Sequence, residues 1–88
     1  SLGWVLYKMD HFEEAVTMLE QAIKRVPFDE DVNEHLGDAY WKVGRTTEAV
    51  YQWNKAIDTS NNENYIYRLR AKIKSGLNGD RETTTASQ

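Results

Sequence analysis

The chain has 88 residues with a net charge of −3, and 40% of them are hydrophobic, 28% are charged and none is cysteine. This length allows one small domain, and the lack of cysteine excludes disulfides, thiolate catalysis and cysteine-ligated zinc. No stretch approaches the roughly 18 apolar residues that a membrane-spanning helix needs, and the N-terminus lacks a signal-peptide pattern, so we expect a soluble chain, with the cytoplasm favoured and no membrane partner.

The charge is divided unevenly along the chain. Residues 1–44 carry nine acidic and four basic side chains, a balance of −5, whereas residues 45–88 carry five acidic and seven basic ones, a balance of +2. Such asymmetry can steer head-to-tail contact between chains, although solvated surface charge is its commoner meaning.

The first half of the chain predicts two helices, over about 1–9 and 11–26. Apolar residues of the second recur at intervals of three and four, which places them on one helix face. Asp10 and Glu13 have the spacing of a capping pair, and Pro27 ends the helix.

Two further helices follow, over about 30–43 and 46–59. Asp29 suits the N-cap of the first of them. Gly44 suits a left-handed C-terminal cap, since glycine has no Cβ to strain that conformation.

The last helix is predicted over about 63–76. Ser60 and Glu63 have capping-box spacing at its start. The remaining residues, 78–88, are rich in Thr, Ser and charge, and we expect them to form a disordered tail.

A period of 34 residues relates the two halves of the helical part. The matching segments are Leu2-Gly3 with Leu36-Gly37, Glu14-Ala15-Val16 with Glu48-Ala49-Val50, and Ala22-Ile23 with Ala56-Ile57. This period is typical of stacked helical hairpins. A glycine directly after a buried-face leucine indicates a close approach between helices, so we expect Gly37 and Gly3 to lie at such contacts and Trp53 to lie in the core.

The stretch NEHLGDAYWKVGRTTEAVYQWNKAI resembles the tetratricopeptide repeat, in the manner of bacterial members of that family. The resemblance covers about residues 1–77 and implies an all-α fold of antiparallel helix-turn-helix repeats. It divides the chain into a truncated first repeat at 1–28, a second repeat at 30–61 and a capping helix at 63–77. Asn33 replaces the family's usual tryptophan, and Trp53 its usual phenylalanine.

The resemblance implies a non-catalytic scaffold that binds a protein or peptide in a concave groove. The positions that correspond to the groove are Trp4, Tyr7, Lys8, Asp31, Glu34, Asp38, Trp41, Lys42, Tyr65, Arg68 and Lys72. The clamp with which some members hold a C-terminal carboxylate is absent, because Trp4 and Asp38 stand where that clamp has asparagine. The three acidic groove positions would repel a carboxylate, so the resemblance favours a basic or amphipathic partner.

Other interpretations stay open. Trp4 and Trp41 suit core packing as well as the groove. The incomplete first repeat predicts further repeats upstream, so the segment suits a purely structural cap of a longer array, and its open N-terminal face suits a homo-oligomer.

Only the last helix offers the basic face that nucleic-acid binding needs, and we therefore expect no nucleic-acid partner. His11 and His35 are too far apart in sequence for a local metal pair, and no phosphate loop or catalytic motif occurs, so we expect no enzyme, no metal and no cofactor.

Overall fold

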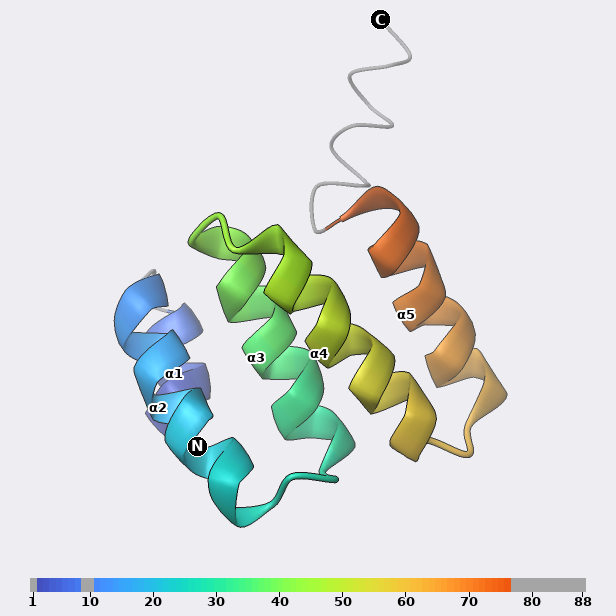
Figure 1. The fold of residues 1–88 in the computed structure, drawn as a ribbon, viewed down its shortest axis with the longest axis horizontal. Helices are drawn as coiled ribbons and strands as arrows, with labels where there is room; N and C mark the ends of the chain where they lie inside the picture. The colour runs from blue at the N-terminus through green and yellow to red at the C-terminus, as the bar shows by residue number, and fades with distance from the viewer. Residues whose placement is uncertain (1, 9–10, 77–88) are drawn as a thin grey trace, which may run out of the picture.

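The computed structural model of the chain describes residues 2–8 and 11–76, and the side chains of residues 6–8 lie outside that description. The described part folds into α-helices with no strand. They are α1 (Leu2–Lys8), α2 (Phe12–Arg25), α3 (Glu30–Lys42), α4 (Thr46–Thr59) and α5 (Glu63–Ser75). The helices follow one another in a row, with α1 and α2 at one end and α5 at the other (Figure 1). This arrangement confirms the predicted all-α helical repeat, whereas the predicted tail at 78–88 lies outside the described residues.

Side-chain caps begin two of the helices. Asp29 accepts the backbone N–H of Val32 at 3.0 Å before α3, as the sequence predicts. Before α5 the cap is Asn62, which accepts the N–H of Tyr65 at 2.9 Å. The prediction that Ser60 caps α5 was therefore wrong, because its hydroxyl lies two residues too early and accepts the N–H of Asn62 instead.

Left-handed glycines follow α3 and α5. Gly44 has φ of +86° and Gly76 has φ of +75°, a region that strains residues with a Cβ. The predicted role of Gly44 as a helix terminator is confirmed. The predicted start of α2 is less simple, since His11 is the N-cap and makes no side-chain capping bond, while Asp10 lies outside the described residues.

The core forms where α3 meets α4. A Cβ on Gly37 would lie 2.5 Å from the indole of Trp53, so only glycine lets the ring lie against the backbone of α3. Trp53 is fully buried, with Ala49 and Ala56 on the same helix face. The same device recurs between α1 and α2, where a Cβ on Gly3 would lie 2.8 Å from Leu19. Both sequence expectations about close glycine contacts are confirmed.

Asn33 is fully buried at the start of α3, at the position where the family pattern has tryptophan. Its side-chain amide donates to the backbone carbonyls of Pro27 and Asp29 at 3.1 and 2.8 Å. The polar side chain therefore ties the α2–α3 turn to α3, a role that a tryptophan at this position would not supply.

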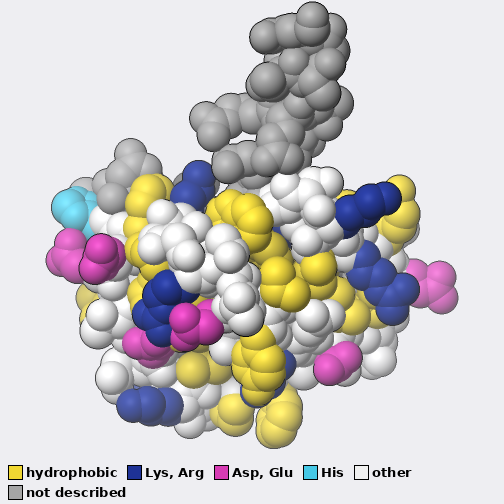
Figure 2. All heavy atoms as spheres, turned by 45° about the horizontal axis from the view of Figure 1, so that its top comes forward, with side chains coloured by type: hydrophobic (Ala, Val, Ile, Leu, Met, Phe, Trp, Pro, Cys, Tyr) yellow, Lys and Arg dark blue, Asp and Glu magenta, His cyan; other side chains and the backbone are white. Residues whose placement is uncertain are grey.

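The outer surface is mixed in character. On the face shown in Figure 2, basic side chains lie apart from one another among acidic and hydrophobic ones. Three large aromatic side chains are strongly exposed, namely Phe28, Tyr51 and Tyr67. Isolated exposed aromatics are ordinary, so each needs a second observation before it indicates a binding surface.

Candidate functional site

Helices α1, α3 and α5 together line a hollow of ≈ 490 Å³. Its lining residues recur one helical turn apart along α3 and α5, so that each of these two helices presents one face to it, and α1 contributes one residue. They are Trp4, Glu30, Asp31, Glu34, His35, Asp38, Tyr65, Arg68 and Lys72. Seven of these nine are residues that the sequence analysis placed in a groove.

An aromatic pair forms one wall of the hollow. The rings of Trp4 and His35 stack face to face, with centroids 3.8 Å apart and planes 8° apart. Burial lowers the pKa of His35, and the opposing charges of Asp38 and Glu34 do not reverse this. His35 is therefore neutral at pH 7, and the pair presents a flat, uncharged surface.

Glu34 forms the centre of the contact between α3 and α5. Its carboxylate accepts hydrogen bonds from the hydroxyl of Tyr65 at 3.0 Å, from Nη1 of Arg68 at 3.0 Å and from Nζ of Lys72 at 2.6 Å. Burial raises the pKa of Glu34, but the hydrogen bonds and charges of Lys72 and Arg68 outweigh it and the pKa is lowered. Glu34 is thus ionised and fully occupied within the chain.

Asp38 lies one turn further along α3 and links the hollow to the core. It accepts the indole N–H of Trp53 at 2.9 Å and the ammonium of Lys72 at 3.1 Å. Burial raises its pKa in spite of the charge of Lys72. Both inner carboxylates of the hollow are therefore paired by groups of this chain, which the sequence analysis did not foresee.

Two further carboxylates lie one turn earlier on α3, at the edge of the hollow, without such partners. Neither Glu30 nor Asp31 forms a side-chain hydrogen bond or ion pair in the part of the chain that is described, and Asp31 is exposed. With four acidic side chains against Arg68 and Lys72, and with His35 neutral, the hollow carries a charge of −2. That charge is concentrated at the Glu30–Asp31 edge, since the inner carboxylates are neutralised.

The other predicted groove residues lie elsewhere. Trp41 packs on Trp53, with centroids 5.6 Å apart, and against Gly76, so that it belongs to the core contact. The ammonium of Lys42 lies 5.7 Å from the ring of Phe12, toward α2. The remaining two, Tyr7 and Lys8, have side chains outside the described part.

Sequence reasoning missed two lining residues, Glu30 and His35. Both could have been found from helical spacing, since each lies four residues from a predicted groove residue, Glu34 and Asp31 respectively.

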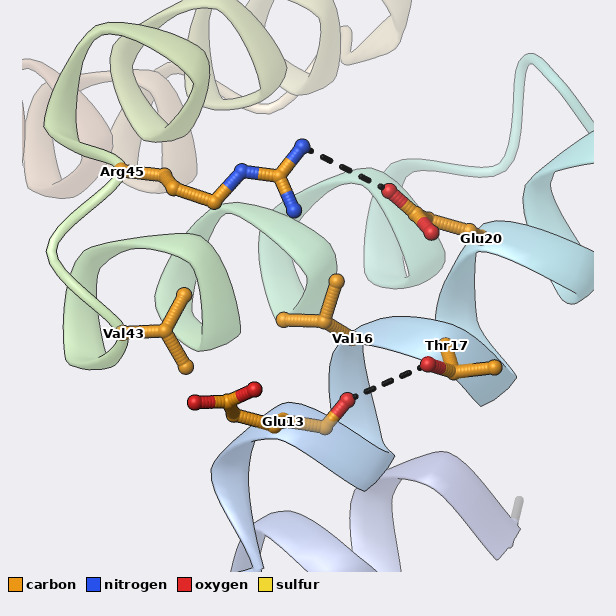
Figure 3. A pocket seen from close by; sticks show the side chains of 6 residues that line it. All are labelled: Glu13, Val16, Thr17, Glu20, Val43 and Arg45. Carbon is orange, nitrogen blue, oxygen red and sulfur yellow. Dashed lines mark hydrogen bonds and ion pairs between the residues drawn. The ribbon is translucent and has the colours of Figure 1, made fainter.

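A second, smaller hollow of ≈ 210 Å³ lies between α2 and the α3–α4 turn. Figure 3 shows the guanidinium of Arg45 above it, directed at Glu20, and the Thr17 hydroxyl bonded to the carbonyl of Glu13. Arg45 also forms two hydrogen bonds with Glu48 and lies over the ring of Tyr40, whose hydroxyl donates to Glu20 at 2.7 Å. These groups satisfy one another, so the hollow is best explained as a by-product of an ion-pair network that supports the turn.

Within the residues that the structure describes, no three acidic or histidine side chains are grouped as a metal would require, and no helix has the length and apolarity to cross a membrane.

The chain is similar to a known protein family. A family model described as tetratricopeptide repeat matches residues 1–64. Neither the curated proteins nor the solved structures yield a significant match.

Proposed function

The chain belongs to the tetratricopeptide repeat family, whose repeats generally mediate protein–protein interaction, and we propose that it binds a basic or amphipathic segment of a partner protein between α1, α3 and α5. The observation that carries this proposal is the pairing of two unoccupied carboxylates, Glu30 and Asp31, with the Trp4–His35 stack on one hollow. The family is typically a non-catalytic scaffold, and we propose the same role here.

The charges of the hollow favour a cationic partner group. A lysine or arginine of the partner can pair with Asp31 without breaking any contact of this chain. Its neighbouring apolar side chains can lie on the flat Trp4–His35 surface, since aromatic surfaces contribute strongly to binding. Arg68, which pairs with Glu34, is half exposed and would disfavour a second cation beside it.

We also propose the division of the chain that the repeat pattern indicates. The first repeat occupies 1–28, the second 30–61, and a closing helix 63–77, with a tail at 78–88. In support, α5 has only one fully buried residue, Leu69, and its outer side is charged, as in helices that end a repeat array. Self-association through the α1–α2 end is part of this proposal.

Two alternatives are weaker. A purely structural cap would leave Asp31 and Trp4 without a partner role, and binding tests decide this directly. Nucleic-acid binding through α5 is disfavoured because Arg68 and Lys72 are engaged by Glu34 and because the hollow beside them is acidic.

The test uses two helical 15-residue peptides, one built from leucine and lysine and the other from leucine and glutamate in the same positions. We expect calorimetry to show micromolar binding of the lysine peptide and at least about tenfold weaker binding of the glutamate peptide. Asp31→Lys should weaken binding of the lysine peptide about tenfold, whereas the matched control Asp58→Lys, on the exposed side of α4, should leave it within about twofold.

Equal weakening by both variants, or preference for the glutamate peptide, would overturn the proposed site. If neither peptide binds at millimolar concentration, the structural cap is favoured.

A further inference from the structure

The α1–α2 end of the row of helices exposes apolar side chains. Leu2 and Val5 are 57% and 49% exposed. Beside Leu2 lies a hollow of ≈ 220 Å³ between α1 and α2, and Gly3 forms part of its lining. Its other lining residues are Leu2, Met18, Gln21, Ala22 and Arg25. This end therefore offers an apolar recess bordered by one cation.

The opposite end of the row exposes an aromatic residue on α5. Tyr67 is 77% exposed, the most of any large hydrophobic residue described. It lies in a stripe of exposed residues along the outer side of the helix, formed by Glu63, Tyr67, Arg70 and Lys74. We call this set the α5 stripe.

Helix α2 carries a stripe with identical spacing. The α2 stripe consists of Glu14, Met18, Gln21 and Arg25. In both stripes the successive intervals are four, three and four residues, so each extends over about 16 Å of helix at 1.5 Å per residue. Both also run from an acidic residue at the N-terminal end to a basic one at the C-terminal end.

The two stripes have the same length and the same order of charges, and this decides in which relative direction the two helices can pack. In an antiparallel arrangement Glu14 faces Lys74 and Arg25 faces Glu63, so that both ends carry opposite charges. In a parallel arrangement each end would bring like charges together, which is unfavourable. The antiparallel arrangement also sets Tyr67 beside Gln21, at the edge of the apolar recess.

The charged ends are available for such pairing. Among the described residues, neither Arg25, Glu63 nor Lys74 takes part in an ion pair, and Glu14 contacts only the exposed His11, at 3.0 Å. Arg25, Glu63 and Lys74 can therefore face a second molecule without losing an internal partner, and Glu14 would give up only its exposed contact with His11.

We propose that the α5 stripe of one copy packs antiparallel on the α2 stripe of a second copy, with Tyr67 entering the recess between α1 and α2. This inference rests on the proposed self-association and names the second surface that it uses. Because the two surfaces differ and lie at opposite ends of the molecule (Figure 1), each copy can bind one neighbour at each end. Association then continues beyond a dimer, as a head-to-tail series.

The contact involves essentially one helix pair, so its affinity is modest. Interfaces of this size give weak, reversible association, and we expect a dissociation constant of roughly 10–100 μM. Sedimentation velocity of the 88-residue chain, from about 5 μM to 1 mM at low salt, should show a weight-average mass that rises steadily above 10.2 kDa. A constant 10.2 kDa over this range would overturn the inference.

Charge reversal tests the pairing itself. Arg25→Glu and Glu63→Arg should each reduce the association constant at least about fivefold, and the double variant should recover it to within about twofold of the original. Lys24→Glu is the matched control, since it makes the same charge change on the adjacent exposed residue outside the α2 stripe, and it should leave association within about twofold. Loss in the double variant as deep as in the single ones would exclude the antiparallel pairing.

A third variant separates this inference from binding in the α1–α3–α5 hollow. Tyr67→Ala should abolish measurable association and leave binding of the leucine–lysine peptide unchanged. Asp31→Lys should weaken binding of that peptide about tenfold and leave association unchanged. Circular dichroism of each variant establishes that it is folded. Association that survives Tyr67→Ala would overturn the named surface, whatever the peptide result.

Discussion

Helix α3 packs against α4 and α5 in two different ways. Toward α4 the contact is tight and mainly apolar, with Gly37 against the indole of Trp53. Toward α5 the contact is largely ionic, with Glu34 and Asp38 held by Lys72 and Arg68. One helix thus uses its glycine side to build the core and its acidic side to hold the last helix.

The difference indicates separate consequences for stability and for binding. Apolar packing stabilises the fold by a large amount, whereas the attraction within a buried ion pair is roughly balanced by its desolvation cost. The ionic contact has another effect, since it neutralises the inner carboxylates and leaves only the Glu30–Asp31 edge acidic. The α3–α4 contact therefore determines whether the domain folds, and the α3–α5 contact determines which part of the hollow is acidic.

The largest effect is expected at the α3–α4 contact. Trp53→Ala removes the largest fully buried side chain and the indole donor of Asp38, and it should lower the free energy of unfolding by about 4 kcal/mol. Urea denaturation followed by circular dichroism measures this. A loss below about 1 kcal/mol would mean that the two helices are not held together by this contact.

The α3–α5 contact should give a smaller loss. Lys72→Met leaves Asp38 with only the indole donor and Glu34 with only Arg68 and Tyr65, so we expect a loss of about 2 kcal/mol at pH 7. Adding Glu34→Gln and Asp38→Asn to that variant should restore most of it, because no buried charge then lacks a partner and the remaining charge, that of Arg68, is half exposed. If the triple variant is no more stable than Lys72→Met, charge pairing does not explain the contact.

The pH dependence of stability distinguishes the two inner carboxylates. The pKa of Glu34 is lowered in the folded state by Lys72 and Arg68. The ionised side chain therefore adds to the free energy of unfolding above its unfolded pKa, and this stabilisation is lost as the pH falls through its folded pKa. The pKa of Asp38 is raised by burial, so its effect has the opposite sign and stability is gained as the pH falls through its folded pKa.

Urea denaturation between about pH 5 and pH 3 should therefore show a shallower loss of stability for Glu34→Gln than for the original chain, and a steeper one for Asp38→Asn. Equal slopes for both variants would contradict the assignment.

The smallest effect is expected at the helix caps. Asn62→Ala removes the acceptor for the N–H of Tyr65 and should cost about 1 kcal/mol, as should Asp29→Ala at the start of α3. Thermal unfolding of the two variants compares them. If Asn62→Ala has no effect while Asp29→Ala does, the start of α5 contributes little to global stability.

Much of the fold follows from the sequence because it depends on local spacing. The 34-residue period, the glycines after Leu2 and Leu36 and the helix-ending Pro27 and Gly44 are readable directly. The observed helices lie within about one residue of the expected bounds at each end. The choice of Asn62 over Ser60 as a cap was not readable, since both lie at plausible positions and the turn geometry decides between them.

The site was only partly predictable because its charges are paired across long sequence separations. Lys72 contacts Glu34, which lies 38 positions earlier in the chain, and Asp38, which lies 34 positions earlier. Periodicity within one helix gives no information about such contacts. For the same reason the sequence does not show that the Trp41 side chain packs on Trp53 and not in the hollow, because its direction depends on how α3 and α4 pack.

The central claim is that a cationic segment binds on the Trp4–His35 stack beside Asp31, and the indole N–H signals of the three tryptophans test it most directly. In a ¹H–¹⁵N titration with the leucine–lysine peptide, we predict that the chemical shift of the Trp4 indole N–H changes with peptide concentration and reaches a plateau. The signals of Trp53, bonded to Asp38, and of Trp41, packed in the core, should stay in place. A shift confined to Trp41 or Trp53, or saturation of binding with an unmoved Trp4 signal, would contradict the account.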